Sequence, residues 1–456
     1  MDSAQGKQER SNFSGRIGFV LAASASAVGL GNLWRFPYLA AKYGGGAFLI
    51  TYLFFVITFG FALMLAEVAL GRNTKLSAIG AFKKFGKKYA FIGILISIVP
   101  MIITPYYSVI GGWILKYFAV YVTGGGAAAA ESGFFGGFIS LSIEPLIWAC
   151  LFVLLCGVVV YLGIQGGIER LNKFLMPALL VILVLIIVYV LMSPGAWEGV
   201  KYYIIPNFEN FGLKTAVAAM GQMFFSMSLA MGIMITYGSY LRKEDNLETS
   251  VTQIEFFDTG VSFLAGLMII PAVFAFSGGE AGAVNAGPGL MFMTLPKVFS
   301  SFPITNVLGT LFFLLVLFAA FTSAISLYET IVSIFQDRFK WQRRKCVIIV
   351  GIGVAVFAAA PSLGFGLLSF ANVAGLSILD IMDFMSNSVL MPIVALLTCL
   401  FVGWWVGPGF ILAEVDESET FRRKRVFLFM IRWGAPVCLI VIFVSYVLSS
   451  IGIISL

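Results

Sequence analysis

The chain has 456 residues, of which 60% are hydrophobic and only 11% are charged, and its mean hydropathy is +0.99. This composition excludes an ordinary soluble domain and indicates an all-α polytopic protein that crosses a membrane many times. The sequence has no histidine, and its five cysteines lie in or beside apolar runs without metal or disulfide spacing. We therefore do not expect an enzyme, because little is left from which to build a metal centre or a nucleophile with its base.

The net charge of +7 could suggest a nucleic-acid partner, but the distribution of the basic residues predicts membrane topology instead. Most Lys and Arg fall in six short clusters that alternate with connections nearly free of both. With the N-terminus in the cytoplasm, all six clusters lie on the cytoplasmic side, and we predict no nucleic-acid partner. The clusters are at residues 7–16, 72–88, 170–173, 242–243, 338–345 and 422–432.

Eleven apolar stretches have the length of about 20 residues that crosses a bilayer. An odd number of spans places the C-terminus outside. We predict spans near residues 17–38, 46–70, 90–122, 146–164, 167–192, 214–240, 250–276, 304–336, 346–360, 373–405 and 427–453.

The first span is interrupted by residues that a membrane helix usually avoids. It contains Gly29, Gly31, Asn32, Arg35 and Pro37 within an otherwise apolar run. The glycines alone could serve close helix packing, but intramembrane polar and charged groups are costly and usually functional. We therefore predict a broken helix, whose freed carbonyls can coordinate a cation and whose freed N–H groups can hold an anionic group.

The sixth span is interrupted in a similar way, between Gly221 and Gly232. Interruptions at corresponding positions of two halves indicate a transporter site between inverted repeats. We predict one transmembrane domain over residues 1–456, with repeat one at about 16–192, repeat two at about 213–405 and an extra helix at about 427–453.

Further polar residues lie inside other predicted spans. Glu67 could accept hydrogen bonds from N–H groups freed by a break, Asp258 could neutralise a cation, and Thr322 and Ser323 could supply hydroxyl oxygens. Each could instead form an ordinary hydrogen bond within or between helices. Oxygen ligands without His or Cys favour an alkali cation over a transition metal.

Six motifs follow one another along the chain: Arg16–Phe19, Ala27–Pro37, Gly44–Phe48, Glu67 with Gly71 and Arg72, Gly221–Phe225, and Thr236–Tyr240. Together they resemble the neurotransmitter:sodium symporters, and the likeness covers spans one to ten. The eleven spans and the short length are similar to the bacterial branch of that family. The resemblance implies a five-plus-five inverted repeat with broken helices 1 and 6, alternating access and a place in the bacterial inner membrane.

The resemblance also implies a sodium-coupled symporter that imports hydrophobic L-amino acids, both aliphatic and aromatic. Met231 replaces the bulky aromatic residue of some relatives, and an adaptable thioether suggests a permissive pocket, although it could simply fill volume. Phe225 is implied to be a lid over the substrate. The implied substrate-binding residues are Ala27, Leu30, Gly31, Ile103, Tyr107, Phe225, Ser226, Ser228, Met231, Ser323 and Leu327.

Two sodium sites are implied in the same way. The first comprises the Ala27 carbonyl, Asn32, Ser226, Asp258 and the carboxylate of the substrate. The second comprises carbonyls and hydroxyls from two spans, namely Ala25, Val28, Ala319, Thr322 and Ser323.

Pairs of charged residues are implied as gates. Arg35 and Asp383 would close the outside, and Arg10 and Asp337 would pair on the cytoplasmic side near Tyr240.

Gly167 and Pro177 frame the start of the fifth span. Proline leaves a carbonyl without its helical donor, so this segment can unwind locally. The resemblance implies that unwinding lets water reach the second sodium site, whereas an ordinary helix start is the alternative.

Asp258 departs from the animal members, which have Asn there and need chloride nearby. Much of the halide pocket of those members is matched here by Tyr52, Gln222, Ser226 and Ser262. The Asp258 carboxylate, however, already supplies a fixed negative charge. We therefore expect no chloride requirement, while the resemblance implies two co-transported sodium ions.

Two other classes of membrane protein remain as alternatives. An ion channel would need a continuous polar pore, whereas the polar residues here converge at mid-membrane. An amino-acid-sensing receptor of the same fold would bind its ligand without transport. The expected partners are a hydrophobic L-amino acid and membrane lipid, with no obligate protein partner.

Overall fold

The computed structural model describes residues 12–209, 211–277, 288–373 and 375–450. Within these ranges all regular secondary structure is helical and there is no strand, apart from isolated bridges that join Gly45 to Pro206 and Val373 to Leu376. The predicted all-α membrane fold is therefore confirmed.

Nine helical segments of the described ranges are long and apolar enough to cross a membrane. Their ends lie within a few residues of the predicted spans. The segments are Gly46–Thr74 (α3, Gly46–Phe55; η2, Val56–Gly60; α4, Phe61–Thr74), Lys87–Val122 (with α6, Ala90–Val122), Glu144–Tyr161 (α9), Ile164–Leu191 (η4, Ile164–Glu169; α10, Arg170–Leu191), Leu247–Ser277 (α14), Thr305–Phe339 (α16), Arg343–Leu363 (α17), Ile378–Trp405 (α18, Ile378–Asp383, to α19, Met391–Leu400) and Lys424–Ser449 (α21, Lys424–Phe429, to α22, Ala435–Ser450).

Two further spans are broken, as predicted. The first consists of α1 (Arg16–Ala27) and a second half formed by η1 (Gly31–Arg35) and α2 (Phe36–Lys42), bent by 53°. The sixth consists of α12 (Leu213–Ser226) and α13 (Ile233–Gly238), each of which is too short to span alone. Both predicted breaks are confirmed, whereas the total of eleven spans stays a prediction.

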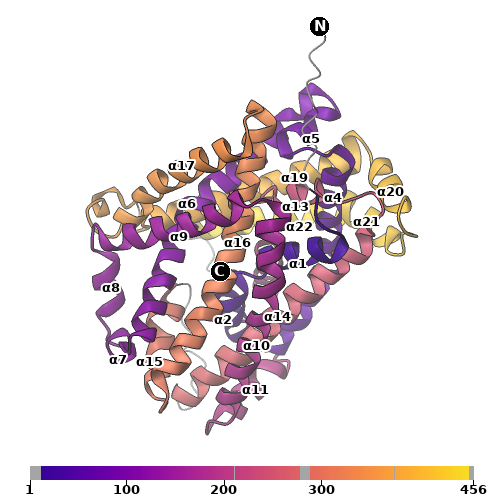
Figure 1. Cartoon of the computed structure of the whole chain (residues 1–456). Helices are drawn as coiled ribbons and strands as arrows, with labels where there is room; N and C mark the ends of the chain where they lie inside the picture. Colours follow the sequence, from indigo (N-terminus) through magenta and orange to yellow (C-terminus); the bar gives the residue numbers. More distant parts are fainter. Residues whose placement is uncertain (1–11, 210, 278–287, 374, 451–456) are drawn as a thin grey trace.

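Short helices form the connections between the spans. At one end of the bundle they include α7 (Gly126–Ala129), α8 (Phe134–Ile139), α11 (Ala196–Ile204) and α15 (Leu295–Ser300), and at the opposite end α5 (Ala78–Lys84) and α20 (Gly409–Asp416) (Figure 1). The broken helices lie within the bundle (Figure 1): α1 packs against α10, α14 and α16, and η1 packs against α12 and α14. Residues at the breaks are therefore enclosed by protein rather than by lipid.

The two breaks have different local conformations. At the first, Val28 adopts an extended conformation with φ −69° and ψ 99°, which ends α1. At the second, Ser228, Ala230 and Gly232 have φ values of 53°, 59° and 75°. Glycine adopts this left-handed region freely, but for the other two residues it costs about 1–2 kcal/mol each. The second break is therefore locally strained and depends on its surroundings.

The inner half of the sixth span is packed backbone to backbone against α4. A Cβ atom on Gly71 would lie 2.0 Å from the Ile235 carbonyl oxygen, and one on Gly238 would lie 2.3 Å from the Val68 carbonyl oxygen. Small residues at both positions therefore let α4 and α13 approach closely.

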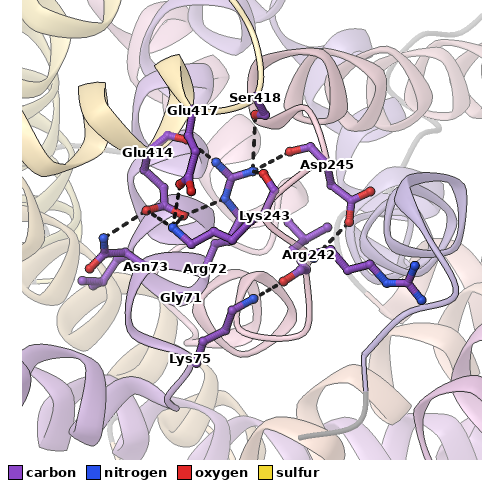
Figure 2. Close-up of polar contacts among 12 residues, drawn as sticks. Gly71, Arg72, Asn73, Lys75, Arg242, Lys243, Asp245, Glu414, Glu417 and Ser418 are labelled. Carbon is purple, nitrogen blue, oxygen red and sulfur yellow. Dashed lines mark hydrogen bonds and ion pairs between the residues drawn. The ribbon is translucent and has the colours of Figure 1, made fainter.

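A buried cluster of charges fixes the ends of the same two helices (Figure 2). Arg72, which is 0% exposed, donates through Nε to Glu414 of α20 at 2.8 Å and through Nη1 to the Asp245 carbonyl. Lys243, which follows α13, contacts the same Glu414 at 3.0 Å. Basic residues that mark the predicted cytoplasmic side thus also tie α4, the segment after α13 and α20 together.

We expect Gly238→Ala to destabilise the protein, because the added methyl group meets the backbone of α4 and neither helix can move aside. Overpacking of this kind costs about 1–3 kcal/mol, which lowers the midpoint of thermal unfolding by roughly 5 °C. Gly353→Ala, where nothing lies within 4 Å of the added Cβ, is the matched control. The measurement is the midpoint of thermal unfolding of the two purified variants. Equal midpoints for Gly238→Ala and Gly353→Ala would contradict the close contact of α4 and α13.

Candidate functional site

The two breaks lie against each other, and a side chain of α16 joins them. The Ser26 carbonyl at the end of α1 accepts hydrogen bonds from Ser228 Oγ in the second break and from Ser323 Oγ of α16, both at 3.0 Å. The freed Gly29 N–H donates to Asn32 Oδ1 at 2.9 Å. Polar side chains therefore satisfy backbone groups that the interrupted first helix leaves open.

Glu67 of α4 accepts a hydrogen bond from a backbone N–H of the second break, as the sequence predicts. Its Oε1 lies 2.8 Å from the Ala230 nitrogen, and the side chain is fully buried. Its Oε2 has no hydrogen-bond partner among the described residues. A buried carboxylate thus supports the left-handed Ala230 directly.

Asp258 of α14 is the centre of a second polar group. It is fully buried and accepts hydrogen bonds from Asn32 Nδ2 at 2.7 Å, Ser226 Oγ at 2.7 Å and the Tyr52 hydroxyl at 3.0 Å. Within the described ranges, no Lys or Arg forms an ion pair with it. A buried carboxylate without a counter-ion is unfavourable, so this group of oxygens is suited to a cation.

The residues that match a halide pocket are engaged with this carboxylate or with the first break. Tyr52 and Ser226 donate to Asp258, whereas Ser262 Oγ accepts from Asn32 Nδ2 at 2.7 Å. Gln222 Nε2 donates to the Gly31 carbonyl at 3.0 Å. Three of the four residues, Tyr52, Ser226 and Gln222, therefore already donate to acceptors of the protein.

Of the residues of the second predicted sodium site, Ser323 of α16 and Val28 at the end of α1 are in direct contact, and the complete site stays a prediction. Ser323 Oγ lies 3.4 Å from the Val28 carbonyl oxygen, and Thr322 Oγ1 lies 3.1 Å from the Ala319 carbonyl oxygen. Ala25 lies in the last turn of α1 and is fully buried. Carbonyl and hydroxyl oxygens without a carboxylate suit a hard monovalent cation.

A small cavity lies between the two breaks, and all eleven predicted substrate-binding residues line it. The remaining lining residues are Ser26, Gly29, Asn32 and Ile233. The cavity has a volume of about 30 Å³, which is room for little more than one water molecule. The Tyr107 hydroxyl lines it and has no hydrogen-bond partner in the described part of the chain. Sequence reasoning missed Ser26 and Ile233, although both directly flank the predicted breaks.

A larger cavity of about 390 Å³ lies on the other side of Phe225, which is the residue that lines both. The Phe225 ring packs on Gly31, where a Cβ atom would lie 2.8 Å from it, and the Arg35 guanidinium lies 5.5 Å from the ring centre. Phe225 thus separates the small cavity from the larger one.

Arg35 and Asp383 both line the larger cavity, but among the described residues they form no direct ion pair. Arg35 Nη2 donates to the Tyr446 hydroxyl at 2.9 Å. Asp383 Oδ1 accepts from the Tyr106 hydroxyl at 3.0 Å and from Asn387 Nδ2 at 2.6 Å. The outer gate stays a prediction, and no local sequence signal identifies these three partners.

Arg10 is outside the described residues, so its pairing with Asp337 stays a prediction. Asp337 Oδ2 accepts from the Ser77 N–H at 2.6 Å. The Tyr240 hydroxyl donates to Glu329 at 2.7 Å, and the Tyr240 carbonyl accepts from the Phe13 N–H at 3.3 Å. The segment before α1 is thus attached to the end of the sixth span.

The fifth span is helical throughout. Gly167 lies in the π-helical turn η4 and Pro177 lies in α10, and the two form one segment from Ile164 to Leu191. A Cβ atom on Gly167 would lie 2.1 Å from the Val159 carbonyl oxygen. Gly167 therefore has a packing role in this conformation, and the unwinding of the segment stays a prediction.

Comparisons with known proteins agree with this geometry. The chain matches the model of the sodium:neurotransmitter symporter family over residues 10–125 and 142–452. It is 35% identical to the uncharacterized sodium-dependent transporter YhdH of Bacillus subtilis, over 98% of this chain and 99% of that protein. It is 27% identical to the human sodium- and chloride-dependent GABA transporter 2, over 91% of this chain and 76% of the transporter.

Among solved structures, the crystal structure of MhsT in complex with L-phenylalanine has a TM-score of 0.85 and 37% sequence identity, covering 96% of this chain and 100% of MhsT. Three findings lead to one conclusion: the two broken helices around oxygen-rich groups, the family match over nearly the whole chain and this structural likeness. The chain belongs to the sodium:neurotransmitter symporter family, whose members are sodium-coupled transporters and not enzymes.

Proposed function

We propose that this transporter imports hydrophobic L-amino acids, aliphatic and aromatic, with two sodium ions across the bacterial inner membrane, with its N-terminus inside and its C-terminus outside. The observation that carries the proposal is the single cavity between the breaks, which all eleven expected substrate-binding residues line. The binding of L-phenylalanine by MhsT, which is similar over the full chain, supports the substrate class.

The two ends of an amino acid would meet different parts of the cavity. The carboxylate would accept from the Leu30 and Gly31 N–H groups, where the second half of the first span begins and the helix dipole favours an anion. The unpartnered Tyr107 hydroxyl would donate to it as well. The side chain would lie against apolar residues such as Ile103 and Met231.

Sodium would bind at the two oxygen groups beside the cavity. The first ion would be held by Asp258, Asn32, Ser226, the Ala27 carbonyl and the substrate carboxylate, which couples the ion to the amino acid. The second would be held by the backbone and hydroxyl oxygens of Ala25, Val28, Ala319, Thr322 and Ser323. The first site would therefore contain the Asp258 carboxylate and the carboxylate of the substrate, whereas the second would contain no carboxylate.

Alternating access would expose the cavity to each side in turn. Phe225 would act as the lid below the larger cavity, with Arg35 and Asp383 closing above it. Arg10 and Asp337 would close the inner side near Tyr240. The attachment of Phe13 to Tyr240 supports an inner closure in this conformation.

Chloride would not be required. Tyr52 and Ser226, which match a halide pocket, both donate to the Asp258 carboxylate. A second anion at this position would face a fixed negative charge and would lose these donors.

We expect proteoliposomes to accumulate leucine and phenylalanine only when sodium is present, driven by a sodium gradient or by an inside-negative membrane potential. Two sodium ions and a zwitterion carry two charges, so ~100 mV supplies about 4.6 kcal/mol, enough for accumulation of roughly 2,000-fold. Uptake of labelled amino acids with sodium, potassium, chloride and gluconate varied is the measurement. Binding without uptake would favour a receptor, and loss of uptake in gluconate would overturn chloride independence.

Asp258→Asn should create a chloride requirement, because it removes the fixed charge and frees the Tyr52 and Ser226 donors. Uptake in gluconate should fall by about tenfold or more, the effect of losing one charge-assisted contact to the ion, and chloride should restore part of it. Asp416→Asn, at an exposed carboxylate of α20, is the matched control. Equal activity of Asp258→Asn in both salts would contradict the assigned role.

Pro177→Ala should slow sodium release to the inside, because it restores a backbone donor and favours the wound helix. Hydrogen exchange of residues 164–177 should also become slower in sodium-free buffer. Pro361→Ala, at a proline within α17, makes the same chemical change away from the site and should alter neither. Unchanged release and exchange in Pro177→Ala would refute the unwinding proposal.

A further inference from the structure

A groove of about 560 Å³ runs along the outer surface of the bundle between α3 and α14. Large apolar side chains line it and remain exposed, including Ile50, Leu53 and Phe256, the last of which is 75% exposed. In a chain that crosses a membrane, such a surface faces lipid chains. The groove is therefore shaped and lined for an acyl chain.

One end of the groove is polar and incompletely satisfied. Glu255 of α14 lines it and is only 4% exposed; its Oε2 accepts from Arg423 Nη2 at 2.9 Å. Its other carboxylate oxygen, Oε1, has no hydrogen-bond partner within the described residues. Thr259, one helical turn further along, also lines the groove with an Oγ1 that has no partner there. A buried, unpaired carboxylate oxygen is costly, so a donor belongs at this position.

The same end also contains the Arg423 guanidinium, which pairs with Glu255 at 2.9 Å and lies 3.9 Å from Glu248. Arg423 lines the groove, donates to the Ile57 carbonyl and Thr252, and keeps 25% of its side chain exposed. It belongs to the run of four basic residues 422–425 at the start of the last span. Basic residues beside the end of a span attract the phosphate groups of lipids.

We propose that this groove binds a phospholipid with a primary ammonium headgroup, of the phosphatidylethanolamine type. Its acyl chain lies along Ile50, Leu53 and Phe256, its phosphate meets Arg423, and its ammonium donates to Glu255 Oε1. A choline headgroup carries no N–H and leaves that oxygen unpaired, whereas a glycerol headgroup brings no positive charge to it. This lipid site is separate from the proposed transport cavity and does not depend on it.

The full-length protein in detergent, mixed with equal amounts of dioleoyl phosphatidylethanolamine, phosphatidylcholine and phosphatidylglycerol, tests the proposal. Native mass spectrometry counts which lipids remain bound. We expect phosphatidylethanolamine to be retained about tenfold over phosphatidylcholine, the effect of one charge-assisted hydrogen bond. Equal retention of either competing lipid would overturn the proposal.

Two variants place the lipid in this groove. Glu255→Gln should bring the ratio of the two lipids close to one. Gly260→Leu fills the groove, since nothing lies within 4 Å of a Cβ at Gly260, and it should reduce phosphatidylethanolamine retention. Gly353→Leu, equally unobstructed on α17, should behave like the wild type. If Glu255→Gln does not fold, Gly260→Leu decides: an undiminished preference for phosphatidylethanolamine in that variant would exclude this groove.

Discussion

Backbone hydrogen bonding at the two breaks is the constraint on which the rest of this structure depends. In a membrane interior each unpaired backbone group costs several kcal/mol, so an interrupted span needs partners supplied by its neighbours. Here the Ser26 carbonyl, the Gly29 N–H and the Ala230 N–H find them in side chains of the other break, α16, Asn32 and Glu67. The same concentration of oxygens that makes the breaks tolerable also makes them suitable for cations.

The charges at the breaks are placed asymmetrically. Asp258 contributes a full negative charge beside the first break, whereas the group around Thr322 and Ser323 contains only carbonyls and hydroxyls. An ion beside Asp258 would have its charge largely neutralised by the protein itself. An ion at the second group would depend on dipoles alone, which bind more weakly than a full charge.

Much of the fold could be predicted from the sequence because the signals are strong. Long apolar runs define the spans, and Asn32, Glu67 and Asp258 stand out because such groups are rare inside a membrane. The left-handed conformations of Ser228 and Ala230 could not be predicted, since neither residue type favours them. Nor could the contact between Arg35 and Tyr446, because it joins residues at opposite ends of the chain.

The lining residues of the small cavity could be predicted only in part from their residue types. Alanine, leucine and isoleucine at its lining positions carry no chemical signal, and only the resemblance to a family selected them. The polar lining residues could be identified from the sequence directly. The volume of the cavity depends on how Phe225 packs on Gly31, and no pattern of residue types determines this packing.

The close approach of α4 and α13, at Gly71 against Ile235 and at Gly238 against Val68, has a mechanical consequence. Because the two backbones already touch, α13 cannot move toward α4 without displacing it. Arg72 and Glu414 join α4 to α20. Any movement of α13 toward α4 would therefore also load the loop that carries α20.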